Sequence, residues 1–206
     1  MGSLRRLDLE TVPGLLATGA LAGLLLSAVS IGAWWLARPE AVSAPAPAAA
    51  AAMAEATVAS VQELRSRDLD FPVEGFGRGK MTDTFNEART GHVHAAADIM
   101  AARNTPVRAV DAGTIARLLK NPSGGITIYQ LDPAQRYIYY YAHLERYAEG
   151  LREGLAVGRG QVIGYVGTSG NAPIETPHLH FGILRGKPSA NWSRGSPVNP
   201  YGLLVP

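Results

Sequence analysis

The sequence predicts a mainly β protein, in which a compact antiparallel β-sheet domain follows one N-terminal transmembrane helix. From residue 105 onward, short runs rich in Val, Ile and Tyr alternate with Gly, Asn, Asp and Pro, the residues that favour turns. In this half of the chain, helical spacing of apolar residues is confined to 144–155. Near the N-terminus, by contrast, one long segment has no charged residue. Together these features indicate an antiparallel domain attached to a single membrane span.

The uncharged segment covers 13–37 and exceeds the roughly 20 residues that cross the hydrocarbon core of a bilayer. Trp34 and Trp35 lie at its far end, where aromatic rings favour the membrane interface. Arg5 and Arg6 favour a cytoplasmic N-terminus, so we expect a single-pass protein of the cytoplasmic (inner) membrane with its folded domain on the periplasmic or extracellular side. A cleaved signal peptide is the alternative, although its apolar core is usually only about 7–15 residues long.

The remaining boundaries follow from composition. Residues 38–57 are nearly all Ala and Pro, which predicts a spacer that is extended where Ala and Pro alternate and helical in the Ala run. We therefore expect a cytoplasmic N-terminus over 1–12, the transmembrane helix over 13–37, this linker over 38–57 and the folded domain over 58–206. A short helix over 58–70 would lead into the domain.

The strands of the domain are bounded by turn signals such as Asp111-Ala-Gly113 and Asn121-Pro-Ser-Gly-Gly125. Residues 144–155 interrupt them as a short helix or an irregular loop. The predicted strands are 105–110, 114–119, 126–131, 137–143, 161–166 and 178–184.

Composition excludes two kinds of site. The net charge is only +2, and no run of basic residues is longer than a pair, whereas nucleic-acid binding needs clustered positive charge. Cysteine is absent, so a metal must be held by His, Asp or Glu.

Two of the five histidines lie two residues apart in Thr176-Pro-His-Leu-His-Phe181. On a strand, side chains at this spacing point to the same face about 7 Å apart, so His178 and His180 can both face one cavity. One could bind a metal while the other transfers protons, and the spacing does not say which. A half-buried strand with two solvent-facing histidines is the alternative.

A second pattern is His94-Ala-Ala-Ala-Asp98. On an extended strand the two Cα atoms would be about 13 Å apart, too far for both side chains to bind one ion, so the segment must bend. With His180, this pair makes a two-nitrogen, one-oxygen set that leaves one position of a tetrahedral Zn²⁺ for water, as in catalytic sites. His178 and His143 then remain as imidazoles that move protons near neutral pH. By strand alternation His143 should share a face with Tyr137, Tyr139 and Tyr141.

In this set of motifs the chain resembles the lysostaphin/LytM-type zinc endopeptidases of bacterial cell walls over roughly residues 70–202. The matching elements are His94-x-x-x-Asp98 followed by Ile99, Thr105-Pro-Val, Asp111-x-Gly113, Tyr141-Ala-His-Leu144, Gly160-Gln-Val-Ile-Gly164, Gly167-Thr-Ser-Gly170, Pro177-His-Leu-His-Phe181 and Pro197-Val-Asn-Pro200.

The resemblance implies Zn²⁺ bound by His94, Asp98 and His180, with His143 and His178 as the catalytic pair. It further implies a compact antiparallel β domain with a groove over the metal and hydrolysis of the stem peptides or cross-links of peptidoglycan. A non-hydrolytic activator of a cell-wall amidase is the first alternative, and would need a cell-wall enzyme as partner. A carrier or carbohydrate-binding β module with an incidental metal is the second.

The chain departs from the family at Ala96, where a glycine is usual. Alanine does not reach positive φ cheaply, so the backbone could differ there and the methyl group could narrow the groove. The residues before the site offer no clear tyrosine for oxyanion contact. His92 is expected to be a spectator and Glu175 to be a groove-wall residue.

Overall fold

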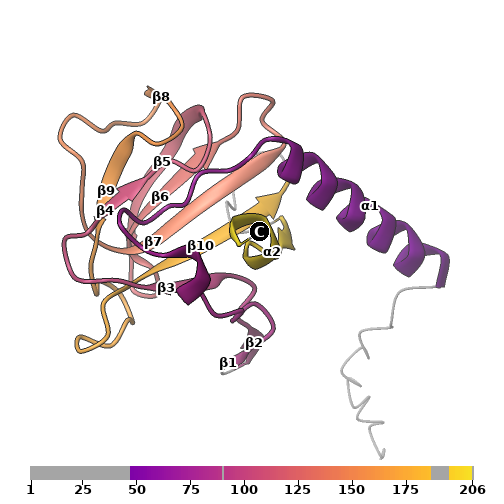
Figure 1. Ribbon diagram of the computed structural model, residues 1–206, viewed down its shortest axis with the longest axis horizontal. Coiled ribbons are helices and arrows are strands. Elements are labelled where there is room, and N and C mark those ends of the chain that lie inside the picture. The colour runs from indigo at the N-terminus through magenta and orange to yellow at the C-terminus, as the bar shows by residue number, and fades with distance from the viewer. Residues whose placement is uncertain (1–46, 90, 187–194, 206) are drawn as a thin grey trace, which may run out of the picture. The chain divides into compact units, whose positions relative to one another are not determined.

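The computed structural model describes residues 47–89, 91–186 and 195–205, and within these ranges most of the regular structure is strand (Figure 1). This confirms the mainly β prediction. The helices are α1 (Pro47–Ser66), a 3-10 helix η1 (Arg78–Lys80) and α2 (Tyr201–Leu204). The strands are β1 (Ala88–Arg89), β2 (His92–Val93), β3 (Ala97–Met100), β4 (Pro106–Arg108), β5 (Gly113–Asn121), β6 (Gly125–Leu131), β7 (Tyr137–Tyr147), β8 (Ala156–Val157), β9 (Val162–Val166), β10 (His178–Arg185) and β11 (Ser196–Val198).

In the described part of the chain, nine strands form one antiparallel sheet and β1 pairs with β2 in a separate hairpin. The main strand order is β11-β10-β7-β6-β5-β8, with β3 also paired to β10 and β9 paired to both β4 and β7. Strand β7 therefore covers one edge of β10, while β3 and β11 share the other edge at its two ends. Figure 1 shows β7 and β10 as long neighbouring arrows. This arrangement brings three distant segments of the chain together on β10.

The predicted strands coincide with β4, β5, β6, β7, β9 and β10, but β7 is longer than expected. It continues to Tyr147, so the helix or loop predicted over 144–155 is wrong for its first four residues. Leu144 lies between Ile126 of β6 and Val166 of β9, and this pairing on both sides holds the backbone extended. Tertiary pairing here overrides the helical spacing of the apolar residues.

The predicted transmembrane segment over 13–37 lies outside the described residues. Among the residues that are described, no helix is both long enough and apolar enough to cross a membrane. Helix α1 runs without a break from Pro47 to Ser66, so it crosses the boundary predicted between linker and domain at residue 58. Its first ten residues are almost all solvent-exposed, whereas Ser60 and Leu64 are buried against the domain.

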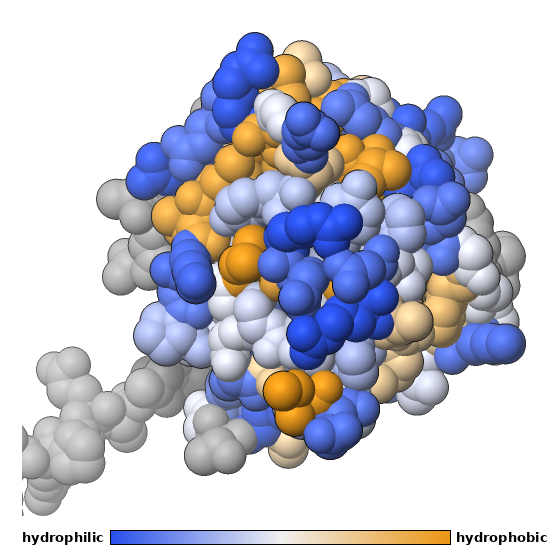
Figure 2. All heavy atoms as spheres, turned by 90° about the vertical axis from the view of Figure 1, so that its left-hand side faces the viewer, coloured by the Kyte–Doolittle hydropathy of each residue, from blue (hydrophilic) through white to orange (hydrophobic). Residues whose placement is uncertain are grey.

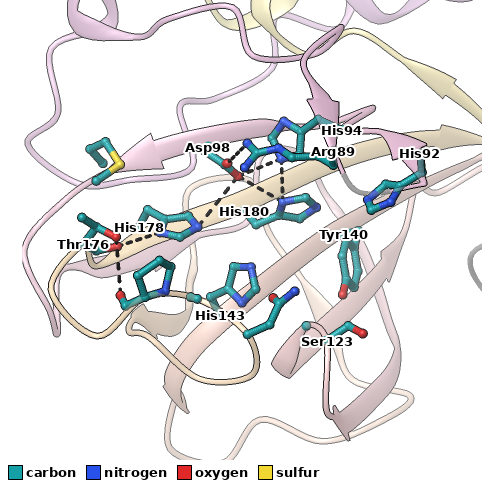
Figure 3. A pocket seen from close by; sticks show the side chains of 15 residues that line it. Arg89, His92, His94, Asp98, Ser123, Tyr140, His143, Thr176, His178 and His180 are labelled. Carbon is teal, nitrogen blue, oxygen red and sulfur yellow. Dashed lines mark hydrogen bonds and ion pairs between the residues drawn. The ribbon is translucent and has the colours of Figure 1, made fainter.

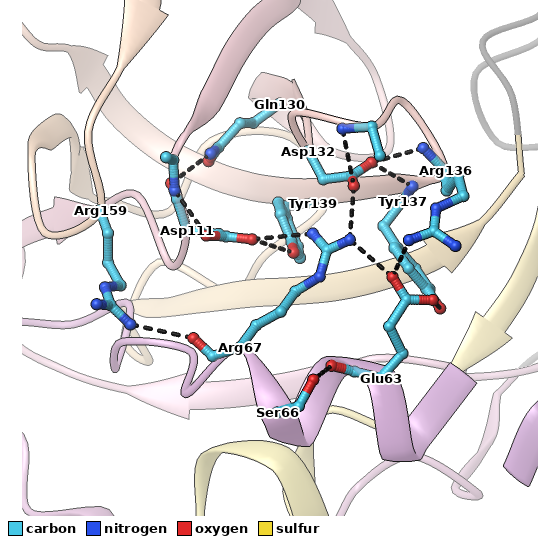
Figure 4. Close-up of polar contacts among 12 residues, drawn as sticks. Glu63, Ser66, Arg67, Asp111, Gln130, Asp132, Arg136, Tyr137, Tyr139 and Arg159 are labelled. Atoms are coloured by element: carbon cyan, nitrogen blue, oxygen red, sulfur yellow. Dashed lines mark hydrogen bonds and ion pairs between the residues drawn. The ribbon is translucent and has the colours of Figure 1, made fainter. Parts of the chain in front are cut away.

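Arg67, just after α1, connects this helix to the sheet (Figure 4). Its guanidinium pairs with Glu63 at 2.8 Å, with Asp111 at 3.1 Å and with Asp132 at 2.9 Å. The Asp132 side chain has no exposed surface, so its charge depends on Arg67 and on nearby backbone N–H groups, including that of Tyr137. These ion pairs make the end of α1 part of the folded domain.

The two faces of β7 have different roles. Tyr139 and Tyr141 are fully buried in the core, and their hydroxyl groups donate to Asp111 Oδ2 at 3.0 Å and to Gln130 Oε1 at 2.8 Å. Tyr140 points to the other side and lines a groove. The core thus occupies one face of the strand and leaves the other available for a site.

The molecular surface is mixed in character. Figure 2 shows the face on the left-hand side of Figure 1, where hydrophilic side chains gather over the centre and apolar ones lie around them in separate patches. Large exposed apolar residues of the described chain are Met53, Val58, Val93, Met100 and Ile174. Met100 also lines the groove, so part of this exposed apolar surface borders the candidate site.

Candidate metal centre and groove

Strand register places the centre of the site. Across the sheet, Asp98 of β3 lies opposite His180 of β10, and Ala142 of β7 lies opposite His180 on its other side. Directly opposed residues have Cβ atoms about 4.5–5.5 Å apart, which is close enough for their side chains to share one ion. The antiparallel pairing of three strands thus brings residues 82 positions apart into contact.

His94 reaches the same point because the chain bends before β3 begins. Ala95 has φ +55, a left-handed conformation that is uncommon for a residue with a side chain. Its N–H donates to the carbonyl of Phe85 at 2.9 Å, which holds the bend. The bend required by the His94–Asp98 spacing is therefore present, at Ala95. Ala96 is buried and is not among the groove-lining residues, so its methyl group does not narrow the groove.

The three predicted ligands converge on one point (Figure 3). His94 Nε2, Asp98 Oδ1 and His180 Nδ1 form a triangle with all three sides at 3.0 Å. Ligand atoms that bind zinc tetrahedrally at about 2.0–2.1 Å lie about 3.3 Å from one another. Two neutral imidazole nitrogens and a carboxylate oxygen are a donor set that suits this ion. The residues present therefore fit a zinc centre.

Backbone carbonyls fix which nitrogen of three imidazoles faces the site. The Nδ1 atoms of His94, His143 and His178 lie 2.9, 2.8 and 2.7 Å from the carbonyl oxygens of Thr84, Ser169 and Thr176. A carbonyl only accepts, so each Nδ1 must hold a proton, and in the neutral ring each Nε2 then presents a lone pair. Such hydrogen bonds to the far nitrogen are typical of histidines that ligate metals or transfer protons.

His143 reaches the groove by a route that the sequence did not predict. The expectation that it shares a face with Tyr139 and Tyr141 is wrong, because it lines the groove with Tyr140. The pairing of β6 with β7 shifts register at this point, and His143 itself has φ +60. Its N–H donates to the carbonyl of Gly124 at 2.8 Å. Because of this irregularity, the His143 ring does not follow the alternation of side chains along β7 and faces the groove. Its centroid lies 5.0 Å from that of the His178 ring and 5.6 Å from that of the His180 ring.

Burial and neighbouring charges set the protonation of the site. Burial lowers the pKa of His143 to about 4, and it also lowers the pKa of His180. Burial alone would lower the pKa of His94, but the hydrogen bond and charge of Asp98 outweigh it and raise that pKa. Burial likewise opposes ionisation of Asp98, yet His180 and His94 hold its pKa well below the usual range. An anionic Asp98 beside neutral His180 is the state that binds a metal.

The groove around these residues has a volume of about 740 Å³. Asn171, Pro173 and Thr176, in the loop before β10, form one wall. Glu175 is not among the lining residues, so its expected place in the wall is wrong. The described lining residues are Arg89, His92, His94, Asp98, Met100, Ser123, Gly124, Tyr140, His143, Asn171, Ala172, Pro173, Thr176, His178 and His180.

Sequence reasoning missed Tyr140 and Arg89. Tyr140 stands edge-on to His180 with 5.9 Å between ring centroids, and alternation against Tyr139 and Tyr141 could have identified it as a residue of the other face. Arg89 ion-pairs with Asp98 from the β1–β2 hairpin, and no sequence spacing indicates that contact. His92, expected to be a spectator, lines the groove.

Comparison with known proteins agrees with this geometry. The family model described as peptidase family M23 matches residues 92–200. Among curated proteins, the chain is similar to the L-Ala–D-Glu endopeptidase of Bacillus subtilis, with 37% identity over 114 residues that cover 53% of this chain and 33% of that protein. It is also similar to the DD-carboxypeptidase/endopeptidase Mpg of Neisseria meningitidis serogroup B, with 33% identity over 118 residues that cover 57% of this chain and 24% of that protein.

Among solved structures, the antimicrobial peptidase lysostaphin from Staphylococcus simulans superimposes with a TM-score of 0.52 and 26% identity. The superposition covers 61% of this chain and 48% of that one. The chain thus spans about a third of the length of the first curated relative and about a quarter of the second.

Proposed function

The chain belongs to peptidase family M23, and from this premise we propose that it is a zinc-dependent endopeptidase acting on the stem peptides or cross-links of peptidoglycan. The observation that supports the proposal best is the 3.0 Å triangle of His94, Asp98 and His180 with two further imidazoles directed at it. A structural zinc site would use a fourth protein ligand, whereas this set leaves a position open. The named activities of the relatives, an L-Ala–D-Glu endopeptidase and a DD-carboxypeptidase/endopeptidase, favour the same class of reaction.

Zinc held by these three ligands would polarise the scissile carbonyl and lower the pKa of bound water towards about 7. The proton transfers fall to the two other imidazoles, which both present a lone pair at Nε2. His178 Nε2 lies 3.9 Å from Asp98 Oδ1, at the edge of the ligand triangle, so it would be within reach of a water held there and suits the role of general base. Burial lowers the pKa of His143, so this ring starts each turnover without a proton on Nε2. The proton that it would give to the leaving amine is therefore the one that His178 removes from the water, and the two rings lie 5.0 Å apart between centroids. While it holds that proton, His143 would also donate a hydrogen bond to the oxyanion.

We further propose that the uncharged segment over 13–37 anchors the chain in the cytoplasmic membrane and holds this domain on the outer side. The support is its length, its lack of charge and the two arginines before it. A reporter fused after Pro206 should be active only when exported, and activity of a cytoplasmic reporter would overturn the orientation.

The function is tested by digestion of purified peptidoglycan with the full chain in detergent, loaded with zinc, and mass spectrometry of the released peptides. We expect new amino termini at one class of peptide bond, and no release by Asp98→Ala. A zinc-replete chain that releases nothing from any wall preparation would overturn the enzymatic proposal. If that chain stimulated a separate amidase instead, the activator alternative would replace it.

A further inference from the structure

Arg89 holds an unusual place at the edge of the site. Among the groove-lining residues that the structure describes, it is the single Arg or Lys, and Asp98 is the single Asp or Glu. Its Nη2 lies 2.9 Å from Asp98 Oδ2 and 2.7 Å from Glu87 Oε2, and its side chain is 41% exposed. Figure 3 shows the guanidinium beside the Asp98 carboxylate, above the groove. The two Asp98 oxygens thus face different partners, Oδ1 the imidazoles and Oδ2 the arginine.

This arrangement leaves positive charge in the groove. A zinc ion on Oδ1 and the guanidinium on Oδ2 would share one carboxylate, so Asp98 cannot neutralise both. Glu87 is the second partner of Arg89, but it is half exposed at the rim and does not line the groove. Solvent-exposed ion pairs contribute only about 0–1 kcal/mol, so Glu87 can be displaced by a better-placed acid. A peptide that brings its own carboxylate would be favoured here over an uncharged one.

We propose that Arg89 is a specificity-determining residue that binds a carboxylate of the substrate. This inference rests on the proposed function. It makes acid-bearing stem peptides the preferred substrate class over uncharged glycine bridges. A guanidinium has five N–H donors, and both ion pairs seen among the described residues use Nη2. When a substrate carboxylate displaces Glu87, the N–H of Nη2 that Glu87 releases and the parallel N–H of Nε or Nη1 can receive that carboxylate in two hydrogen bonds.

The distances say where that carboxylate would lie along the substrate. Arg89 is 2.9 Å from Asp98, a charge-assisted hydrogen bond adds about 2.8 Å, and a zinc–oxygen bond about 2 Å. The path also crosses the Asp98 carboxylate from Oδ1 to Oδ2, which adds roughly 2.2 Å. The substrate carboxylate oxygen therefore lies no further than roughly 10 Å from the metal. Because consecutive Cα atoms are about 3.8 Å apart, it belongs to a residue within about three positions of the scissile bond.

The probe is a synthetic stem peptide of L-Ala, γ-linked D-Glu, L-Lys and D-Ala, in three forms. In one both carboxylates are free, in the second the D-Glu α-carboxylate is amidated, and in the third the C-terminal carboxylate is amidated. Binding to the full zinc-loaded chain is measured by calorimetry in a His143→Ala background, and hydrolysis in the unsubstituted background, with zinc content checked for each variant. We expect amidation of one of the carboxylates to weaken binding about 10-fold or more, the usual effect of losing a charge-assisted pair.

Two neighbouring substitutions should act in opposite directions. Arg89→Gln should abolish the difference between free and amidated peptides, and Arg89→Lys should restore part of it. Glu87→Gln should strengthen binding of the free-acid peptide, because it removes the competing carboxylate. A merely structural role of the hairpin would not give changes of opposite sign.

The proposal is overturned if Arg89→Gln retains the same amidation penalty as the unsubstituted chain, or if Arg89→Gln loses its zinc, which would assign Arg89 to holding Asp98. Cleavage of all three peptides at equal rates would also overturn it while leaving the proposed endopeptidase function intact. If the chain bound the free-acid peptide preferentially through Arg89 but hydrolysed none of the peptides, the endopeptidase proposal would be overturned and the role of Arg89 in binding would stand.

Discussion

The two histidines of β10 point into the same groove, yet the geometry predicts different consequences for their replacement by glutamine. His180 Nδ1 lies 3.0 Å from both His94 Nε2 and Asp98 Oδ1 and completes the ligand triangle. His178 Nε2 lies 3.9 Å from Asp98 Oδ1, outside that triangle. We therefore expect His180→Gln to lose the metal and His178→Gln to keep it.

The size of each effect follows from the number of ligands. Binding free energies of zinc in protein sites are on the order of 10 kcal/mol, so one of three ligands contributes about 3 kcal/mol and its loss should weaken zinc binding at least about 10²-fold. His178→Gln removes no ligand atom, but it removes the proposed general base. Such losses reduce rates by about 10²–10⁴, which is about 3–5 kcal/mol in the activation barrier.

Zinc content after dialysis against a weak chelator, together with hydrolysis of one peptidoglycan preparation, distinguishes the two variants. We expect about one zinc per chain and little activity for His178→Gln, but little zinc and little activity for His180→Gln. His143→Ala is the matched control, since it also removes a groove imidazole without removing a ligand. A metal-free His178→Gln beside a metal-replete His180→Gln would reverse the assignment.

Three further predictions concern the support of the site. Arg67→Met should lower the free energy of unfolding, measured by urea titration, by about 2 kcal/mol or more, because it leaves a buried carboxylate without its cation. Arg65→Met, at an exposed position in the last turn of α1, should change it little. Burial alone would raise the pKa of Glu63, but its bonds to neighbouring cations and a tyrosine lower it. The stabilisation from its charge is therefore present above about pH 4.5 and is lost as the pH falls below that. Glu63→Gln should be less stable than the unsubstituted chain at pH 7, and the difference in free energy of unfolding should shrink as the pH is lowered below about 4.5. Gly125→Ala would place Cβ 2.2 Å from the Ser169 hydroxyl oxygen. It should lower the free energy of unfolding by about 1–3 kcal/mol more than Gly150→Ala does, because Gly150 has a similar positive φ but no atom within 4 Å of the added Cβ. Equal losses of stability in the two variants would contradict the close packing of Gly125 against Ser169.

Most of the strands could be predicted from the sequence because turn residues and period-2 patterning are local signals. Asn121 to Gly125 marked a turn that the structure contains, and Asp111 to Gly113 marked a bend that leads into β5. The predicted helix or loop after His143 was wrong where Leu144 pairs on both sides with other strands. That pairing depends on residues about 20 positions away, so no local pattern reports it.

Part of the candidate site could be predicted from the sequence, and part depends on long-range contacts that could not. His94, Asp98 and His180 were grouped from residue type and motif resemblance, and the structure brings their side chains together. Their assigned roles stay predictions. The contact of Arg89 with Asp98 depends on where the β1–β2 hairpin, with two residues in each strand, lies relative to β3. Neither the hydrophobic period nor the spacing of residues reports this contact, so Arg89, which we propose to bind a substrate carboxylate, could not be identified from the sequence.

Two backbone positions that shape the site share one conformation. Ala95 and His143 are both non-glycine residues with positive φ, at 55° and 60°, and each lies where the chain turns a side chain into the groove. A left-handed residue with a Cβ costs roughly 1–2 kcal/mol, so the surrounding hydrogen bonds to Phe85 and Gly124 must hold both conformations against their own preference. Strict alternation would have placed His143 among the buried tyrosines of β7, where its ring could not reach His178. The strained backbone is therefore what converts a regular sheet, with one face committed to the core, into a surface that presents four imidazoles and a carboxylate to one groove.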